Sequence, residues 1–392
     1  MAWKTVRADE FCSFVTDGTH DSPKPQSQGR KLITSKHLKG DHIDFDSANW
    51  ISEGDYQKII ARSAVEQWDI LFSMIGTIGT IYLEKSPIVE YACKNMGVFK
   101  FAGNAENAFW MYYYLKSPQA KEYIQSHLRG STQAYVPLGS LREMPVSIPD
   151  RETRNRIVSL LKPLDEKIAT NRAINDNLYE MVNAYYTSLF KDVECEMTTI
   201  GNYAERIYSG GTPTTSNVAY WDGTFGWLSS GETRNRFVIS TEKSITQTGI
   251  DNSSTKLASK HDIVMASAGQ GFTRGQTSML LIDTYVNQSV IVIHADRNIL
   301  PYLFWNLANR YEELRAISDS SSIRGSLTTK KIAAFEIPLA NNDVIQTFSD
   351  FAWAVIPQIE NNLLENERLA ALRDSLLPKF MSGEIDVSDV QL

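Results

Sequence analysis

Three segments of this chain combine basic residues with hydroxyl and amide side chains and contain no acidic residue. They span residues 22–40, 129–142 and 322–331 and hold five, two and three Lys or Arg residues. Lys and Arg can neutralise phosphates, while Arg, hydroxyl and amide side chains also hydrogen-bond to base edges. A single polar loop needs no functional explanation, but three of them at related positions favour contact with nucleic acid.

A fourth segment, residues 209–232, joins a Gly-rich turn to a Thr/Ser run and three aromatic residues, with no catalytic group in view. We expect Gly210 and Gly211 to form a tight turn with positive φ, and Pro213 to stiffen the loop that follows. The aromatic residues are expected to anchor the domain core rather than to stack on bases, with the Tyr220 hydroxyl as the exception that can reach outward. The three aromatic residues are Tyr220, Trp221 and Trp227.

The candidate DNA-contacting residues come from these segments, from the stretch VTDGTHDSP and from small-residue turns near the middle of each half. They are cationic, hydroxyl, amide or imidazole side chains expected on loops. In the first half they are Thr19, His20, Lys24, Arg30, Lys31, Lys36, Thr77, Thr80, Arg129, Thr132 and Gln133. In the second half they are Thr212, Thr214, Thr215, Ser216, Tyr220, Arg234, Arg236, Gln270, Thr273, Arg274, Arg324, Lys330 and Lys331.

Motifs for catalysis or metal binding are missing from the sequence. It has no GxxxxGK[ST] phosphate loop and no Asn-Pro-Pro-aromatic run of the kind found in amino-methyltransferases. Its six histidines show no metal-ligand spacing, and its three cysteines are too sparse to build a zinc site. The stretch GQGFTRG, residues 269–275, lacks the dinucleotide-binding register and predicts a strand-to-strand turn. We therefore expect no catalysis, cofactor or metal in this chain.

The chain contains an internal duplication. A shift of 191 positions aligns residues 157–190 with residues 348–381, so that Asn171 falls on Asn362 and Asn175 on Asn366. The order of the chain is therefore domain, helix, domain, helix. Further matches precede the helices: residues 69–79 with 262–272, the RGS triplet 129–131 with 324–326, and Gly18-Thr19 with Gly211-Thr212.

The two helical segments carry apolar residues at alternating spacings of four and three, from Ile157 to Leu189 and from Phe348 to Phe380. This is the seam of a coiled coil, and two seams in one chain most simply pack on each other. Asn residues at matching seam positions either pair and fix the register or face solvent; their repetition favours pairing. Pro163 is expected to kink or stagger the start of the first helix.

Both globular parts mix short apolar strands with turns, which predicts an α+β fold with mainly antiparallel sheets. A helix is expected at residues 106–128, with its counterpart at 300–317. The fold class is therefore two similar α+β domains separated by two long helices packed as an antiparallel coiled coil. The expected strands are LITSKHL, DILFSMI, IYLE, GVFKFA and MPVSI, then GWLSS, DIVMAS, TSMLLI, SVIVIHA and FEIPL. The expected bounds are residues 1–148 and 193–338 for the domains, 149–192 for the central helix, and 339–392 for the C-terminal helix and tail.

Composition places the chain among ordinary globular proteins, with 42% hydrophobic and 22% charged residues. Its formal net charge of −7 argues mildly against nucleic acid, but net charge averages over patches, and acids gather on the helices. No apolar run could span a membrane, and the first residues lack the apolar core of a signal peptide. Three separated cysteines fit reduced thiols, so we expect a cytoplasmic protein.

With these motifs the sequence resembles the specificity subunit of type I restriction–modification enzymes. The stretch GGTPTTSNVAYWDGTFGWLSSGE resembles the opening of a target-recognition domain of that family, and VTDGTHDSP resembles a variant of it. DILFSMIGTIG and DIVMASAGQGFTRG are similar to its central motif, IPDRETRNRIVSLLKPLDEKIATNRAINDNL to its spacer helix, and LLPKFMSGEIDV to its C-terminal end. Because the two openings differ, the domains are expected to read different DNA sequences.

The resemblance implies a non-catalytic subunit that reads a bipartite, asymmetric site in double-stranded DNA. Each recognition domain would read one half, and the helices would set the gap. The implied partners are two modification (methyltransferase) subunits, which use S-adenosylmethionine to methylate adenine, and restriction subunits, which use ATP and Mg²⁺. Two other classes stay open on the residues alone. One is a scaffold of tandem repeats without a DNA role, and the other is a self-sufficient restriction enzyme or methyltransferase, whose motifs are missing.

Overall fold

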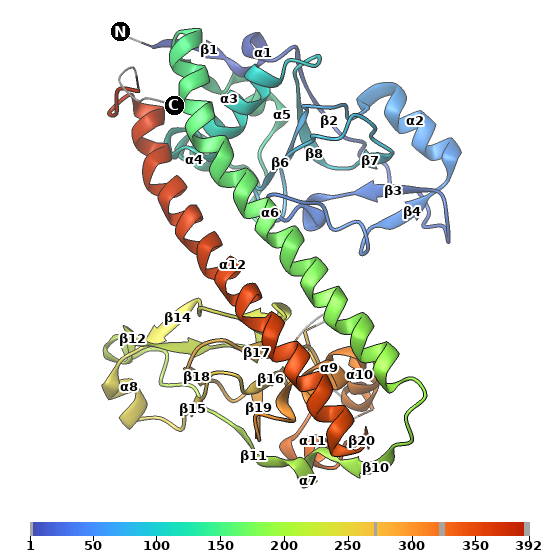
Figure 1. Ribbon diagram of the computed structural model, residues 1–392. Helices are drawn as coiled ribbons and strands as arrows, with labels where there is room; N and C mark the ends of the chain where they lie inside the picture. The colour runs from blue at the N-terminus through green and yellow to red at the C-terminus, as the bar shows by residue number, and fades with distance from the viewer. Residues whose placement is uncertain (1–2, 270–272, 321–325, 388–392) are drawn as a thin grey trace. The chain divides into compact units, whose positions relative to one another are not determined.

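The computed structural model describes residues 3–269, 273–320 and 326–387 (Figure 1). By its internal contacts the chain forms two compact units, Met1–Ala169 with Arg368–Leu392, and Thr170–Glu367. Each unit contains strands, short helices and one segment of each long helix, α6 (Arg151–Phe190) and α12 (Asn342–Ser382). The expected α+β class and the two long helices are confirmed.

The described residues of the first unit form three sheets. A two-stranded sheet pairs β1 (Lys4–Arg7) with β9 (Pro145–Ile148). An antiparallel sheet has the order β2 (Phe14–Asp17), β8 (Met96–Lys100), β5 (Ile70–Ser73), β6 (Ile81–Leu83). The third has the order β4 (Asn49–Ile51), β3 (Arg30–Ile33), β7 (Tyr91–Cys93), and β3 and β7 run parallel. The helices are α1 (Ala8–Phe11), η1 (Ser35–His37), α2 (Glu53–Ser63), α3 (Ala105–Lys116), α4 (Pro118–Ser126) and α5 (Leu138–Glu143).

The second unit repeats this plan. A two-stranded sheet pairs β10 (Glu196–Thr199) with β20 (Glu336–Leu339). A second sheet has the order β11 (Ala204–Ser209), β19 (Val290–Ala295), β16 (Ile263–Ala266), β17 (Thr277–Leu280), β13 (Phe237–Val238). The third has the order β14 (Lys243–Ile245), β12 (Trp221–Leu228), β18 (Thr284–Val286), β15 (Lys256–Ala258). The helices are α7 (Ile200–Tyr203), η2 (Val218–Tyr220), η3 (Ser230–Arg234), α8 (Gln247–Asp251), α9 (Leu300–Asn309), α10 (Tyr311–Asp319) and α11 (Thr329–Ala333).

The strand orders confirm the duplication. The order β2-β8-β5-β6 corresponds to β11-β19-β16-β17, and β4-β3-β7 corresponds to β14-β12-β18. The parallel pair β3–β7 has its counterpart in the parallel pair β12–β18. The second unit adds β13 and β15 at the sheet edges. Most other pairings are antiparallel, as expected.

One expected strand ends earlier than the sequence indicated, and two expected helices each divide into two. The strand expected over residues 32–38 stops at Ile33, because Thr34 and His37 form a reciprocal capping box that begins η1. The helix expected over residues 106–128 divides at Ser117, whose hydroxyl caps α4 just before Pro118. Its counterpart over residues 300–317 divides at Arg310. Polar capping side chains therefore override the strand and helix periodicity at Thr34 and Ser117, whereas Arg310 makes no side-chain capping bond.

One short helix fills the core of each unit. Residues 108–115 of α3 are buried, with Trp110 and Tyr113 among the largest fully buried side chains. In the second unit, α9 buries Tyr302, Phe304 and Trp305 in the same way. Burying several large rings on one short helix fixes it against the sheet and the long helices, since each ring removes much apolar surface from water.

Paired Asn residues confirm the expected register of the long helices in the second unit. Asn171 Nδ2 of α6 donates to Asn366 Oδ1 of α12 at 3.0 Å, and Asn362 Nδ2 donates to Asn175 Oδ1 at 2.8 Å. All four side chains are buried, which rules out the alternative that they face solvent. Asn171 pairs with Asn366, and the later residue Asn175 pairs with the earlier residue Asn362, so the two helices run antiparallel.

The apolar seam is confirmed with one exception. Leu372 is 47% exposed, whereas Leu377, which lies outside the predicted seam, is buried in the core of the first unit. The helix α6 continues through Pro163. In the first unit, Arg373 Nη1 donates to Asp165 Oδ1 at 2.6 Å, which ties α12 to α6. The two helices therefore pair in each unit through polar contacts as well as the apolar seam.

Candidate nucleic-acid interface

Five loops of the first unit meet and form what we call the first loop cluster, residues 18–22, 34–37, 75–80, 94–95 and 129–135. Backbone bridges join Thr19 to Lys94 and Ile75 to Tyr135, and the Lys94 amide donates to the Ile33 carbonyl at 2.9 Å. A Cβ added to Gly76 would lie 3.3 Å from Ser35 Oγ, so the turn of η1 lies against residues 75–80. The topology thus gathers segments that are far apart in sequence.

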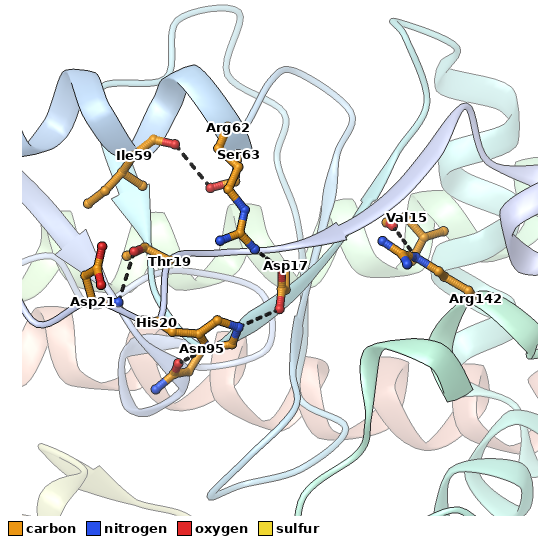
Figure 2. Close-up of polar contacts among 10 residues, drawn as sticks. All are labelled: Val15, Asp17, Thr19, His20, Asp21, Ile59, Arg62, Ser63, Asn95 and Arg142. Carbon is orange, nitrogen blue, oxygen red and sulfur yellow. Dashed lines mark hydrogen bonds and ion pairs between the residues drawn. The ribbon is translucent and has the colours of Figure 1, made fainter.

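A chain of polar contacts runs through this cluster (Figure 2). The buried carboxylate of Asp17 accepts a hydrogen bond from Arg62 Nη2 at 2.7 Å and pairs with His20 Nε2 at 2.8 Å. His20 Nδ1 lies 2.9 Å from Asn95 Oδ1. The His20 side chain is 64% exposed, so its ring is held in one orientation while it still faces solvent. Arg142, also drawn in Figure 2, instead donates to the Val15 carbonyl at 3.0 Å.

The expected contact residues of the first unit fall into two groups. Exposed residues are Lys24, Lys36, Thr77, Arg129, Thr132 and Gln133, together with His20. The others are engaged within the protein. Thr19 is buried, and Arg30 pairs with Glu53 at 3.0 Å and with Glu90 at 2.5 Å. Lys31 donates to the Ala48 carbonyl at 2.9 Å and lies over the Trp50 ring. Thr80 donates to the Thr77 carbonyl at 3.0 Å. DNA contact by each of these residues stays a prediction.

His37 is a buried residue of the first loop cluster and stabilises its turn at residues 34–37. The imidazole is buried, and its Nδ1 accepts the Thr34 amide hydrogen at 2.9 Å. Burial lowers the pKa of His37, which keeps Nδ1 unprotonated and able to accept this bond at neutral pH. In the second unit, Glu232 fills the same capping role for Ser229. In each unit a buried side chain therefore caps the short helix, η1 or η3, at this place in the fold.

The second unit gathers equivalent segments in a second loop cluster, residues 210–217, 229–235, 267–269, 273–276, 287–289 and 326–331. The Gly211 amide donates to the Val286 carbonyl at 3.1 Å, and the Ser267 amide donates to the Ser289 carbonyl at 2.8 Å. The Leu327 amide donates to the Ser267 carbonyl at 2.9 Å. The residues that follow β11, β16 and β18 and the residues that precede α11 therefore meet as in the first unit.

The backbone contacts correct one alignment made from the sequence. The Thr19 amide donates to the Cys93 carbonyl as the Gly211 amide does to Val286. Because Cys93 and Val286 occupy equivalent ladder positions, Thr19 corresponds to Gly211, one residue from the expected partner Thr212.

The Gly-rich turn has a different cause from the expected one. Neither Gly210 nor Gly211 is among the residues with positive φ. A Cβ on Gly210 would lie 1.9 Å from the Val286 carbonyl oxygen, and one on Gly211 would lie 2.0 Å from Ser254 Oγ. Glycine is therefore required because the loop runs directly against a neighbouring backbone. In the first unit Gly18 meets the Cys93 carbonyl in the same way.

Replacing Gly210 with alanine should lower the free energy of unfolding by about 1–3 kcal/mol, because the added methyl group must displace the Val286 backbone. Urea unfolding measures this loss. Gly231→Ala is the matched control in the same unit, since its Cβ would meet nothing closer than 3.9 Å. If both variants were equally stable, the close approach would not explain the glycine.

The expected contact residues of the second unit are also divided. Thr214, Thr215, Ser216 and Lys330 are exposed, and Tyr220, Thr212 and Thr273 are half-buried. Of the two Trp residues expected as core anchors, Trp227 is buried and donates to the Gly211 carbonyl, and Trp221 is half-buried. Arg234 pairs with Glu242 at 2.8 Å, Arg274 pairs with Asp319 at 2.7 Å, and Lys331 Nζ lies 3.4 Å from the Ile317 carbonyl. Gln270 and Arg324 lie outside the described residues.

Arg236 lies against the long helix. Its guanidinium is 4.1 Å from the centre of the Tyr179 ring and pairs with Asp176 at 3.4 Å and Glu180 at 3.7 Å. A DNA phosphate would have to compete with these two carboxylates. This arrangement joins the strand β13 region to α6 within the second unit.

Some polar residues of the clusters were not identified from the sequence. Asn95 and Gln288 follow β7 and β18 in stretches without a basic or Gly-rich pattern, and Asp17 and Arg62 are 45 positions apart. The signal that could have found Asn95 and Gln288 is their equivalent place in the duplication.

Among the described residues, no group of three or more His, Cys, Asp or Glu side chains is arranged to hold a metal ion. None of the described helices has the length and apolar character needed to cross a bilayer.

Comparisons with known proteins agree with this duplicated architecture. The Type I restriction enzyme HindI specificity subunit of Haemophilus influenzae is 20% identical over an alignment of 407 residues, which covers 83% of this chain and 88% of that protein. The EcoR124I/EcoR124II specificity subunit of Escherichia coli is 26% identical over 243 residues, or 59% of each chain. The crystal structure of a type I restriction–modification S subunit from M. genitalium shares the fold, with a TM-score of 0.56, 14% identity and 96% coverage of both chains.

A family model described as the Type I restriction modification DNA specificity domain matches the chain twice. The matches cover residues 2–180 and 193–365, so each includes one globular part and part of α6 or α12. Two successive matches over most of the chain agree with the repeated strand order. The protein therefore belongs to the family of type I restriction–modification DNA specificity subunits.

Proposed function

We propose that this chain reads a bipartite, asymmetric site in double-stranded DNA, with each unit reading one half. The observation that carries this proposal is the repetition of a loop cluster at the same place in both units, rich in hydroxyl and amide groups. Cationic side chains of these loops can hold phosphates, while amide and hydroxyl groups can contact base edges. The differing residues at equivalent positions support different half-site sequences.

The paired helices then act as the spacer between the two half-sites. Buried Asn pairs in the second unit and the Asp165–Arg373 pair in the first support a fixed register. A fixed register makes the distance between two half-sites a property of the protein. This step leads to the prediction that matched changes in helix length alter the gap.

The chain itself performs no chemistry in this proposal. Two modification subunits, which bind S-adenosylmethionine, methylate adenine at the site, and restriction subunits use ATP and Mg²⁺. The assembled complex acts in the cytoplasm. Membership of the specificity-subunit family supports this division of labour.

Methylome sequencing of the host strain, with and without this gene, tests the function. We expect one bipartite methylated motif to disappear when the gene is deleted. Persistence of every methylated motif, together with binding of the purified complex to DNA in the absence of this chain, would instead favour a scaffold role.

Removing two exposed cations of the first loop cluster should weaken DNA binding across all sequences. In Lys36→Ala/Arg129→Ala, loss of two phosphate contacts reduces the slope of log K against log salt by about 2. A salt titration of DNA binding by the complex measures this. The matched control is Lys85→Ala/Lys121→Ala, which removes two exposed cations outside the cluster. Equal slopes for the two double variants would place the DNA elsewhere.

A further inference from the structure

An amide side chain occupies the same turn in both units. Asn95 lies two residues after Cys93 at the end of β7, and Gln288 lies two residues after Val286 at the end of β18. These two strand ends hold equivalent positions in the ladders with β3 and β12. Counted from these strand ends, Asn95 and Gln288 hold the same position in each loop cluster. The loop of the second unit is one residue longer before the next strand, because Met96 and Val290 pair with the equivalent residues Ser73 and Ala266.

A neighbouring loop holds each amide by its oxygen. His20 Nδ1 lies 2.9 Å from Asn95 Oδ1, and Thr212 Oγ1 donates to Gln288 Oε1. Because Thr19 corresponds to Gly211, His20 and Thr212 are also equivalent. The same pairing therefore occurs twice with different residue types, which a chance surface contact does not explain.

The first unit fixes this arrangement most firmly. Asp17 is 5% exposed and contacts His20 Nε2 at 2.8 Å, while Arg62 holds the other carboxylate oxygen at 2.7 Å. The imidazole ring is therefore constrained at both nitrogens, and it in turn orients the Asn95 amide (Figure 2). Such a series of positioned groups reduces the entropy lost when the amide binds a ligand.

Each amide keeps the groups needed to read a base. Its NH₂ group is a donor, and its oxygen has a second lone pair beside the one used by His20 or Thr212. A phosphate offers acceptors alone, so an amide oxygen cannot contribute to holding it. A planar donor–acceptor pair matches N7 and the N6 amino group of adenine in the major groove.

We propose that Asn95 and Gln288 are specificity-determining residues, each reading one adenine in its own half-site, and that His20 and Thr212 are positioning residues. This inference rests on the proposed function and names the contact within it. The exposed cations Lys24, Lys36 and Arg129 hold the backbone, while the amides discriminate between bases.

The test replaces each amide with its carboxylate isostere in the host strain, as the sole copy of the gene, and sequences the methylome. Asn95→Asp is expected to change one position of the first half-site away from adenine and toward cytosine, because a carboxylate accepts from the cytosine amino group. Binding of the complex to the original site should fall roughly 10-fold to 100-fold. Gln288→Glu should do the same in the second half-site and leave the first unchanged.

Two controls separate base reading from the effect of added charge. Gln125→Glu adds the same charge at an exposed position of α4 outside the cluster and should leave the motif unchanged. Asn95→Ser removes the amide without adding charge, and it should make the same position tolerant of several bases. His20→Gln should weaken the preference at that position without replacing it, since its role is to orient Asn95.

The outcomes distinguish this inference from the function on which it rests. If gene deletion leaves all bipartite motifs intact, the proposed function is wrong. If the motif depends on the gene but stays identical in Asn95→Asp, Asn95→Ser and Gln288→Glu, the amides do not read bases. Uniform weakening on all sequences, without a change of motif, would also overturn the inference, because it would indicate a backbone contact.

Discussion

Replacing Asn362 with leucine is expected to lower the free energy of unfolding by about 1–3 kcal/mol. Asn362 Nδ2 donates to Asn175 Oδ1 at 2.8 Å, and both side chains are buried. In the variant, Asn175 Oδ1 stays buried in the apolar seam but loses the hydrogen bond from Asn362. Water does not replace that hydrogen bond, so the buried acceptor is left unsatisfied. Urea unfolding of the full chain, followed by circular dichroism, measures the change.

The double variant Asn175→Leu/Asn362→Leu should recover most of that loss. Replacing both partners with apolar groups removes the stranded acceptor and adds apolar contact to the seam. A double-mutant cycle gives the coupling between the two residues. Asn361→Leu, on the adjacent exposed position, is the control and should change stability by less than about 0.5 kcal/mol. Additive effects of the two seam substitutions would mean that the pair does not stabilise the helices.

Inserting one heptad into both long helices is expected to lengthen the gap between the two half-sites. The insertions belong after Ala169 in α6 and after Glu367 in α12, where the two units divide. Seven helical residues add ~10 Å, which corresponds to at most about three base pairs at ~3.4 Å each. Methylome sequencing should therefore show the same two half-sites separated by one to about three additional base pairs.

A heptad inserted in α6 alone is the informative control. The pairs Asp165–Arg373 and Asn171–Asn366 lie on either side of the insertion point. An unmatched insertion must break one of these pairs or force residues out of α6, so stability and methylation should both fall. If the matched insertion left the gap unchanged, the helices would not set it.

The long helices show how much of this fold was predictable from sequence. Their seam repeats at a spacing of 3.5 residues, and this local pattern predicts a coiled coil whatever the rest of the chain does. The Asn positions on the seam predicted pairing, and each Asn of one copy pairs with the non-corresponding Asn of the other because the helices are antiparallel. The exposure of Leu372 and the burial of Leu377 were not predictable, since the globular part of the first unit determines which face of the helix is covered.

The loops were less predictable because their partners come from distant parts of the chain. Sequence composition marked Arg236 and Arg274 as contact candidates, but α6 and α10 supply the acids that engage them. Conversely, Asn95 has no notable neighbours in sequence, and only its contact with His20, 75 positions earlier, makes it a candidate. Charge and polarity are local properties, whereas the availability of a side chain depends on tertiary contacts.

The sequence by itself determined the duplication, the α+β class, the paired helices and the family, because each depends on periodicity or on motifs contained in short stretches. Tertiary structure decided which loops meet, why Gly210 and Gly211 must lack a side chain, and which cations are already paired. The physical reason is that a repeated hydrophobic period specifies burial within its own element. The position of a polar loop side chain is instead set by hydrogen bonds to backbone and side chains that the fold brings from elsewhere.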